Sequence, residues 1–459
     1  MPVLSRFRGG VHPPYNKRPQ NERAIIPLAP GETLKVPLSQ HIGAPCVPVV
    51  KVGDTVKLGQ LIGEVPEGKL GARIHSPVSG TVTGFEMIPH QSGGFCKCVV
   101  IANDGRDELD PLINREGRDV DAMTPEEITE AVRNAGLVGM GGAGFPTAVK
   151  ISSCRGKTIE YCIANGAECE PYLSCDDRVM VEHAERVVSG VVLLSRAVNA
   201  KNTVIAIEKN KPEAIKCIEA AVASLGVKVT VVQLPVKYPQ GGEKQLIKAI
   251  MNAKVPSGKL PADVGAAIFN VSSCAAAYNA CRFNMPLVTT TVTVAGSCIK
   301  SPENFEARVG TPFEVLAAAC GGFCEDPAKV ISGGPMTGAA LSTLETPVTK
   351  TTTGLITFTA EEVKGEYDGA CIRCGKCVGV CPMGLSPFLF AAYGEVNNTA
   401  ALTRYHVKDC IECGCCAYVC TGRVPLIARI RAGKARVAIA EAEAKEKAAK
   451  AKEKEAEAK

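Results

Sequence analysis

Two cysteine runs near the C-terminus constrain this chain more than any other feature. Both follow the spacing C-x2-C-x2-C-x3-C, first in Cys371, Cys374, Cys377 and Cys381, which Pro382 follows, and again in Cys410, Cys413, Cys416 and Cys420. The chain has 459 residues and 22 cysteines, nine of them between Cys371 and Cys420. The opening Met-Pro-Val-Leu-Ser-Arg-Phe-Arg lacks the apolar stretch of a secretion signal. We therefore expect a cytoplasmic protein whose clustered thiolates bind metal.

This spacing is typical of a domain that binds two [4Fe–4S] clusters, in which the fourth cysteine of each run reaches the other cluster. We assign Cys371, Cys374, Cys377 and Cys420 to one cluster, and Cys410, Cys413, Cys416 and Cys381 to the second. Cys415 lies out of register, and we do not expect it to be a ligand. Two zinc sites are the alternative, but zinc normally uses pairs of C-x2-C motifs. Because such clusters pass single electrons, a second redox centre is expected to supply the reaction.

Composition excludes several other classes of protein. Hydrophobic residues make up 46% and charged residues 22% of the chain, enough for a buried core. A net charge of +5, no Trp and only 5% aromatic residues argue against nucleic acid as a partner. The uncharged run 264–281 is interrupted by asparagine and serine, and no segment is expected to span a membrane.

The pattern of glycines, prolines and apolar residues predicts a multidomain α/β protein in five parts. Residues 1–115 have short alternating segments, and the stretches 50–63 and 74–82 predict β hairpins of a barrel-sandwich domain without a lysine that could carry a lipoyl or biotinyl group. Residues 116–285 alternate strands with helices, which predicts a Rossmann-like parallel sheet. Residues 286–345 form a β-rich module, 355–437 the two-cluster domain, and 438–459 a charged Ala/Glu/Lys tail.

Several boundaries follow from local signals. Thr124-Pro125-Glu126-Glu127 predicts a capped helix that ends at about Ala135, before Gly136. Strands are predicted over 158–164, 203–208 and 227–234, and helices over 177–198, from Pro212 and from about Glu243. Residues 107–121 and the Thr-rich segment 346–353 are expected to connect domains. The tail is expected to be a solvated helix, with a partner-binding helix as the alternative.

A dense glycine loop lies at Gly139-Met140-Gly141-Gly142-Ala143-Gly144-Phe145-Pro146-Thr147. It contains G-x-G-x-x-G, but it follows a predicted helix, whereas the dinucleotide fingerprint follows a strand. Glycines at this density still let backbone N–H groups approach a phosphate or a flat ring. A plain flexible loop is the alternative.

This loop together with Lys150 resembles the flavin-binding loop of the NADH-oxidising subunit of respiratory complex I. Asn165-Gly166-Ala167-Glu168-Cys169-Glu170-Pro171 is similar to that family's N-A-D-E-x-E-P, with Ala167 in place of an aspartate. Tyr238-Pro239-Gln240-Gly241-Gly242-Glu243 and Phe269-Asn270-Val271 resemble two further motifs of the same family. The variants present here, and the opening Phe7-Arg8-Gly9-Gly10-Val11-His12, resemble the C-subunit family of Rnf-type ferredoxin:NAD oxidoreductase complexes across nearly the whole chain.

The resemblance implies noncovalently bound FMN, NAD(H) as substrate and a β-grasp module at 286–338. The residues it assigns to cofactor binding are Gly139, Gly141, Gly142, Ala143, Gly144, Phe145, Lys150, Asn165, Glu168, Glu170, Tyr238, Gly241, Gly242, Glu243 and Asn270. NAD(H) is expected to stack against Phe145, with Glu170 and Glu243 nearby as catalytic residues. At Gly142 we expect a β-branched side chain to obstruct the flavin and to strain the backbone. Glu243 is expected to be a buried carboxylate, with a helix N-terminal role as the alternative.

The resemblance also implies a function. The protein is expected to pass electrons between two clusters, FMN and NAD(H) in an ion-translocating ferredoxin:NAD oxidoreductase. Its partners are expected to be integral-membrane subunits and a ferredoxin-like iron–sulfur subunit, and its place the cytoplasmic face of the cell membrane, as a peripheral subunit. A soluble flavin/iron–sulfur NADH reductase of the cobalamin-reductase kind and an electron-conducting subunit without flavin are the alternatives.

Overall fold

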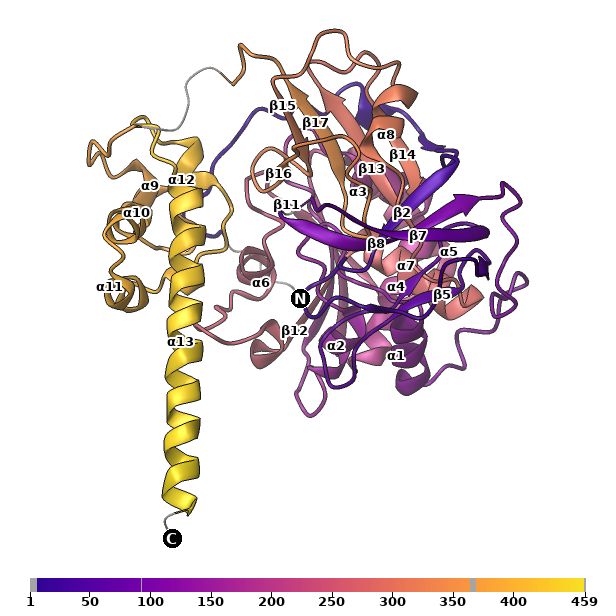
Figure 1. Ribbon diagram of the computed structural model, residues 1–459, viewed down its shortest axis with the longest axis horizontal. Helices are drawn as coiled ribbons and strands as arrows, with labels where there is room; N and C mark the ends of the chain where they lie inside the picture. Colours follow the sequence, from indigo (N-terminus) through magenta and orange to yellow (C-terminus); the bar gives the residue numbers. More distant parts are fainter. Residues whose placement is uncertain (1–5, 92, 364–368, 458–459) are drawn as a thin grey trace.

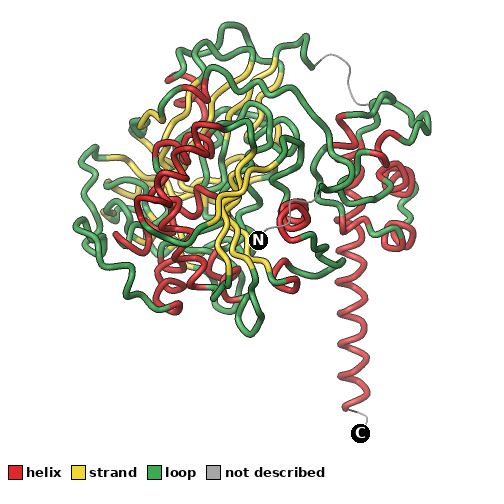
Figure 2. Tube along the Cα trace, turned by 180° about the vertical axis from the view of Figure 1, so that it is seen from behind, coloured by secondary structure: helices red, strands yellow, loops and turns green. Residues whose placement is uncertain are grey.

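The computed structural model describes residues 6–91, 93–363 and 369–457, and side chains up to residue 450. Four domains follow one another along the chain (Figure 1). Three of them pack into a large body, and the fourth forms a separate helical lobe beside it, from which one long helix projects (Figure 2). Among the described residues, no helix has both the length and the apolar character that crossing a membrane requires.

The first domain consists of two small antiparallel sheets around a common core. One sheet has the order β2-β8-β7-β4 and the other β3-β5-β6. Their bounds are β2 (Thr33–Pro37), β3 (Val47–Pro48), β4 (Thr55–Val56), β5 (Leu61–Glu64), β6 (Ile74–His75), β7 (Gly80–Pro89) and β8 (Phe95–Asn103). The predicted hairpins within 50–63 and 74–82 are wrong, because β4 pairs with β7 and β5 pairs with β3 and β6. Each stretch contributes a strand to both sheets, so Leu34, Ile62, Val82 and Ile101 can share one core.

The second domain has the predicted parallel sheet, in the order β11-β10-β9-β12. Its strands are β9 (Tyr161–Gly166), β10 (Asn202–Glu208), β11 (Thr230–Leu234) and β12 (Ala266–Asn270), and its helices are α1 (Pro125–Asn134), α2 (Thr147–Ser152), α3 (Cys175–Glu182), α4 (Ala184–Ala197), α5 (Pro212–Leu225), α6 (Glu243–Met251) and α7 (Val271–Phe283), with a short 3-10 turn η2 (Pro261–Val264). The capping box of Thr124 and Glu127 is present. The single helix predicted over 177–198 is wrong, since His183 breaks it into α3 and α4.

The third domain is a six-stranded mixed sheet that extends beyond the predicted 286–345. Its order is β1-β14-β13-β17-β15-β16, with strands β1 (Ile25–Pro27), β13 (Thr289–Gly296), β14 (Glu303–Arg308), β15 (Lys329–Ser332), β16 (Ala339–Ala340) and β17 (Gly354–Phe358), one helix α8 (Phe313–Ala319) and the 3-10 turn η1 (Gln20–Glu22) before β1. The chain's first strand thus forms one edge. The segment 346–353 is largely buried and is no free connector, because Thr346, Thr349, Lys350 and Thr352 are each about 1% exposed.

The fourth domain is helical and carries both cysteine runs. It comprises α9 (Lys376–Gly379), α10 (Pro387–Glu395), α11 (Thr399–Arg404), η3 (Val407–Asp409), α12 (Cys415–Tyr418) and α13 (Leu426–Glu457). Its core includes Phe390, Leu402 and Ile430 of α10, α11 and α13. Beyond Val437 the helix α13 is mostly exposed up to residue 450, as the predicted solvated tail requires, and residues 458–459 of that tail lie outside the described residues.

Candidate functional site

The glycine loop joins α1 to α2 and is closed by its own backbone. Gly139 N–H donates to the Phe145 carbonyl over 2.9 Å. Gly141 has φ +71°, and a Cβ there would lie 3.0 Å from the Asn270 Nδ2, so the loop needs glycine at this position. Gly142 lies outside the left-handed region, and a Cβ there would meet no atom within 4 Å. The expected strain at Gly142 is therefore wrong, and the space over its Cα is open, as a cradle for a ligand requires.

Two predicted asparagines lie beside this loop, where β9 and β12 reach the carboxyl edge of the sheet. The Asn165 amide donates to the Gly241 carbonyl over 2.8 Å. The Asn270 Oδ1 accepts from the N–H groups of Ser272 and Ser273 and caps α7. Ligands of open α/β sheets bind outside this edge. The structure therefore brings the glycine loop, Asn165, Gly241 and Asn270 together.

Lys150 and Glu243, both predicted to lie at the flavin, form an ion pair. Lys150 Nζ lies 3.0 Å from Glu243 Oε1 and also donates to the Ile268 carbonyl over 2.9 Å. Glu243 is the first residue of α6, and its side chain is 40% exposed. The expectation of a buried carboxylate is therefore wrong. The pair still places a cation and an anion next to the strand that ends at Asn270.

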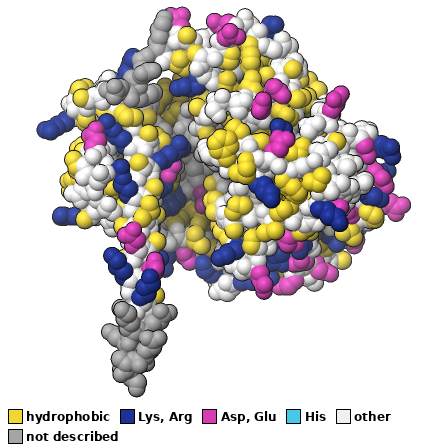
Figure 3. Space-filling view, viewed as in Figure 1, with side chains coloured by type: hydrophobic (Ala, Val, Ile, Leu, Met, Phe, Trp, Pro, Cys, Tyr) yellow, Lys and Arg dark blue, Asp and Glu magenta, His cyan; other side chains and the backbone are white. Residues whose placement is uncertain are grey.

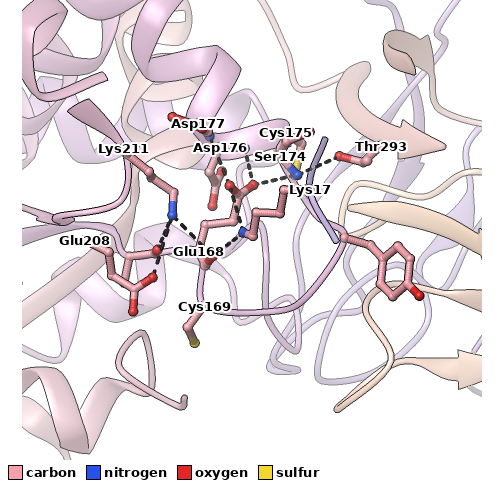
Figure 4. Close-up of polar contacts among 12 residues, drawn as sticks. Lys17, Glu168, Cys169, Ser174, Cys175, Asp176, Asp177, Glu208, Lys211 and Thr293 are labelled. Atoms are coloured by element: carbon pink, nitrogen blue, oxygen red, sulfur yellow. Dashed lines mark hydrogen bonds and ion pairs between the residues drawn. The ribbon is translucent and has the colours of Figure 1, made fainter. Parts of the chain in front are cut away.

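Glu168, which the resemblance assigns to FMN, contacts the start of α3 (Figure 4). Its side chain is 3% exposed, and its two oxygens accept from the backbone N–H groups of Asp176, over 2.7 Å, and Asp177, over 3.3 Å, at the start of α3. Lys17 Nζ lies 3.6 Å from Glu168 Oε2. Burial raises the pKa of this carboxyl group. The carboxylate caps α3, and its assignment to FMN stays a prediction.

The same close-up shows a buried network that sequence reasoning missed. Lys211 Nζ donates to the Ala167 carbonyl over 2.8 Å and lies 3.7 Å from Glu208 Oε2, and both side chains are 1% exposed. Asp176 accepts from Asn270 Nδ2 over 2.6 Å, which ties the network to the glycine loop. Lys211, Glu208 and Asp176 occur in none of the motifs. Lys17 comes from a segment 151 positions away from Glu168, so no sequence signal could have grouped these side chains.

Glu170 and Tyr238 lie where three domains meet. The Glu170 carboxylate accepts from the Met336 N–H over 3.1 Å and from the Thr337 hydroxyl, and it lies 3.4 Å from the Tyr238 hydroxyl. Desolvation raises the pKa of Glu170. The predicted catalytic role of Glu170 beside Glu243 stays a prediction, and so does stacking of NAD(H) on the partly buried Phe145.

The two cysteine runs line two separate cavities of the fourth domain. Cys371, Cys374 and Cys377 share the first cavity with Cys420, which belongs to the other run. Cys410, Cys413 and Cys416 share the second cavity with Cys381. This exchange of the fourth cysteine is the arrangement that a two-cluster domain needs, so the donor sets fit [4Fe–4S] clusters. Cys415 is fully buried and also lines the second cavity, a position that its place in the sequence does not indicate.

The second cavity lies against the domain that carries the glycine loop. The Tyr238 hydroxyl donates to the Cys413 carbonyl over 2.7 Å, and the Gln245 Nε2 lies 3.3 Å from the Met383 sulfur. Val11, Tyr238 and Cys415 form a small apolar cluster at the same place. The first cavity is more open to solvent, since Cys371 and Cys374 are exposed.

Known proteins match this arrangement over almost the whole chain. The C subunit of the Na⁺-translocating ferredoxin:NAD⁺ oxidoreductase complex of Acetobacterium woodii is 43% identical over 434 residues, which cover 94% of this chain and 97% of the relative. The chain belongs to the C-subunit family of ion-translocating ferredoxin:NAD⁺ oxidoreductase complexes. Another member, from the proton-translocating complex of Clostridium ljungdahlii, is 41% identical over 89% of this chain and 88% of its own length. The member from the Rhodobacter capsulatus complex is 41% identical over 83% of this chain and 73% of its own length.

Family models assign each domain of this C-subunit homologue. Residues 5–106 match the RnfC barrel sandwich hybrid domain, 132–279 the Nuo51 FMN-binding domain, 291–340 the SLBB domain and 365–421 the 4Fe-4S dicluster domain. The predicted fold class, the family and the FMN and iron–sulfur cofactors are confirmed. The assignment of individual residues to those cofactors stays a prediction.

Proposed function

We propose that this chain carries electrons between two [4Fe–4S] clusters, FMN and NAD(H) in a membrane-bound ferredoxin:NAD⁺ oxidoreductase complex. The observation that carries the proposal is the seating of the second cysteine cavity against the flavin-binding domain, through the contacts of Tyr238 with Cys413 and of Gln245 with Met383. A cofactor that exchanges single electrons and a substrate that takes a hydride need a flavin between them, because a flavin handles both one and two electrons.

Different groups of residues serve the clusters and the FMN site. Cys371, Cys374, Cys377 and Cys420 hold the outer cluster, and Cys410, Cys413, Cys416 and Cys381 hold the inner one. The glycine loop, Asn165, Gly241 and Asn270 surround the FMN site at the carboxyl edge of the sheet. Lys150 supplies a cation there and Glu243 holds it in place. The network beneath the loop, from Asp176 to Glu168, orients Asn270 and fixes the start of α3.

Reconstitution tests this function directly. The purified chain, given iron, sulfide and FMN under anaerobic conditions, is expected to hold about eight iron atoms and one FMN, and to reduce an artificial dye with NADH. Bound FMN excludes the alternative of an electron-conducting subunit without flavin. Loss of NADH–dye turnover in a preparation with full FMN and iron would contradict the proposal.

Location in the cell distinguishes the proposed membrane-bound complex from the alternative of a soluble reductase. We place the chain at the cytoplasmic face of the membrane, held by integral-membrane subunits and supplied by a ferredoxin-like subunit. In cell fractions it is expected with the membranes, and high salt or a chaotrope is expected to release it. A chain found wholly in the soluble fraction of cells that make the membrane subunits would favour the soluble reductase.

A further inference from the structure

A cavity of about 480 Å³ lies where the first three domains meet. Its walls include Leu58 of the first domain, Val179 of α3, Phe283 of α7, Val288 before β13, and part of the segment 107–115 that joins the first domain to the second. Small-molecule sites in proteins have volumes of about 300–1,000 Å³ and mostly apolar walls. The size and the lining of this interdomain cavity are those of such a site.

The interdomain cavity is separate from the candidate FMN site. Met140 is the one described residue of the glycine loop that lines it, and neither Gly241 nor Asn270 does. The helix α7 contributes Ala275 and Ala276, whose small side chains leave this space open. The cavity therefore has room for a ligand of its own.

Two of the charged side chains at the cavity lack a partner. Of its Arg, Asp and Glu residues, Arg308 pairs with Asp107 across 2.8 Å, and Glu306 accepts from a threonine hydroxyl of the same sheet over 3.3 Å. Within the described part of the chain, the guanidinium groups of Arg115 and Arg186 have neither a carboxylate nor another polar group as a partner. Blue and magenta side chains are interspersed over this face of the large body in Figure 3, so attraction of an anion to the cavity depends on these two local charges.

The cavity also touches residues that hold the glycine loop in place. Met140, which lines it, donates its N–H to the Ser273 hydroxyl over 2.9 Å. Ser272, which also lines it, donates to Asp176 over 2.7 Å, and Asp176 accepts from the Asn270 amide over 2.6 Å. A molecule in the cavity therefore contacts both the loop and the network beneath it.

We propose that the interdomain cavity binds a small apolar carboxylic acid. Its carboxylate pairs with the exposed Arg115 and Arg186, and its apolar part lies against α7 and Met140. Binding is noncovalent and transfers no electron or proton, and neither a cluster nor a nicotinamide takes part, so the inference goes beyond the proposed function. Because the acid restrains Met140 and Ser272, less conformational entropy is lost when FMN binds afterwards. The acid and FMN are thus expected to strengthen each other's binding by the same factor.

Calorimetric titration of the reconstituted chain tests the site with octanoate, an aliphatic acid, 2-naphthoate, an aromatic one, and octan-1-ol as the neutral control. At least one acid is expected to bind with a dissociation constant below about 1 mM, and more tightly than the alcohol. The double variant R115Q/R186Q is expected to weaken binding of that acid about fivefold or more, and of the alcohol less than twofold. The matched double R155Q/K216Q removes the same charge from exposed positions of the second domain and is expected to weaken neither.

Ala276→Leu fills the cavity without a change of charge and is expected to weaken binding of acid and alcohol alike, about fivefold or more. Melting temperatures show whether the variants fold, and the exposed double R115Q/R186Q decides the matter if A276L does not. Equal weakening of the acid by both doubles, unchanged binding to folded A276L, or no binding of either acid would overturn the site. With saturating acid, the dissociation constant of FMN is expected to fall about twofold or more. An unchanged constant would overturn the coupling to the glycine loop.

Discussion

The Tyr238 hydroxyl donates a hydrogen bond to the backbone carbonyl of Cys413 across 2.7 Å. The two residues lie 175 positions apart, one after β11 in the flavin-binding domain and the other in the second cysteine run. The tyrosine is 3% exposed, so this bond is shielded from water. It directly joins the FMN-binding domain to the loop of the second cysteine run.

Replacing Tyr238 by Phe removes that contact without changing the shape of the side chain. The Cys413 carbonyl is left buried without its donor, which is expected to cost about 1–3 kcal/mol of unfolding free energy. Thermal unfolding of the reconstituted protein measures the loss, and Tyr161→Phe is the matched control at a half-buried strand position. An unchanged melting temperature for Y238F would show that the docked lobe does not depend on this bond.

Cys381→Ala and Cys420→Ala test the exchange of ligands between the runs. Because Cys381 lines the second cavity, its loss is expected to damage the cluster of Cys410, Cys413 and Cys416. Cys420→Ala is expected to damage the cluster of the first run instead. EPR spectra with iron analysis distinguish the clusters, and the reverse pattern would refute cross-ligation. Cys415→Ala is expected to keep about eight iron atoms, although the thiol lines the second cavity.

Comparing Gly142→Val with Gly141→Val distinguishes two effects of a new side chain, obstruction of the FMN site and strain of the loop backbone. At Gly142 the new side chain occupies open space above the loop, so FMN retention is expected to fall while the melting temperature of the FMN-free protein stays the same. Gly141 has φ +71°, and a Cβ there would lie 3.0 Å from the Asn270 Nδ2. Val at this position is therefore expected to lower both FMN retention and the melting temperature. Flavin absorbance and thermal unfolding of the same preparations give the two quantities. Stoichiometric FMN in G142V would refute the cradle.

Glu243→Gln keeps the shape of the side chain and removes its charge from the pair with Lys150. Because that charge holds the Lys150 ammonium 3.0 Å away, NADH–dye turnover or nicotinamide affinity is expected to change, with FMN and iron content near wild type. A helix N-terminal role alone predicts a small loss of thermal stability and unchanged kinetics. Steady-state kinetics and a melting curve on one preparation decide between the two.

Lys350 predicts a dependence of stability on pH. Its ammonium group is buried between the carbonyls of Arg73, 2.6 Å away, and Gly136, 2.8 Å away, and desolvation lowers its pKa from 10.5 to about 7. Between these values the unfolded chain binds a proton that the folded chain does not, so the unfolding free energy rises with pH. From pH 7 to pH 9 this side chain is expected to add about 2 kcal/mol.

Lys350→Met keeps the apolar stem and removes the titrating group. The difference in unfolding free energy between wild type and K350M is expected to shift in favour of the wild type as pH rises over this range. Denaturant unfolding at pH 7, 8 and 9 measures it, with Lys445→Met on exposed α13 as the control. A difference independent of pH would show that Lys350 stays charged in the folded protein.

Local signals predicted the elements well where each depends on its neighbours in sequence. The capping box at Thr124, the α6 start at Glu243 and the parallel sheet follow from such signals. Pairings across long separations were not predictable. β1 and β17 are too short to identify their sheet, and the wrong hairpins arose because turn residues do not specify which strands pair.

The candidate site, like the fold, was predictable from the sequence only in part. Cysteine spacing alone predicted which thiols share a cavity, because the ligand geometry of a cluster restricts it. Of the residues that the resemblance assigns to FMN, Asn165, Gly241, Asn270 and the glycine loop lie close together, and their role stays a prediction. The role of Glu168 was not foreseeable, because capping of α3 and the approach of Lys17 depend on tertiary packing.

The segment around Gly10 and Val11 bears on how the protein is made. Gly10 N–H donates to the carbonyl of Val380, far along the chain in the first cysteine run, and Val11 exchanges backbone hydrogen bonds with Tyr238. At 5–20 residues per second, a ribosome needs roughly 20–75 s to synthesise the stretch between Gly10 and Val380. Val11 has no partner until Tyr238 has been synthesised, and Gly10 has none until Val380 has been, although their own barrel sandwich has already emerged. Closure of this segment therefore comes late in biogenesis, once the first cysteine run has been translated.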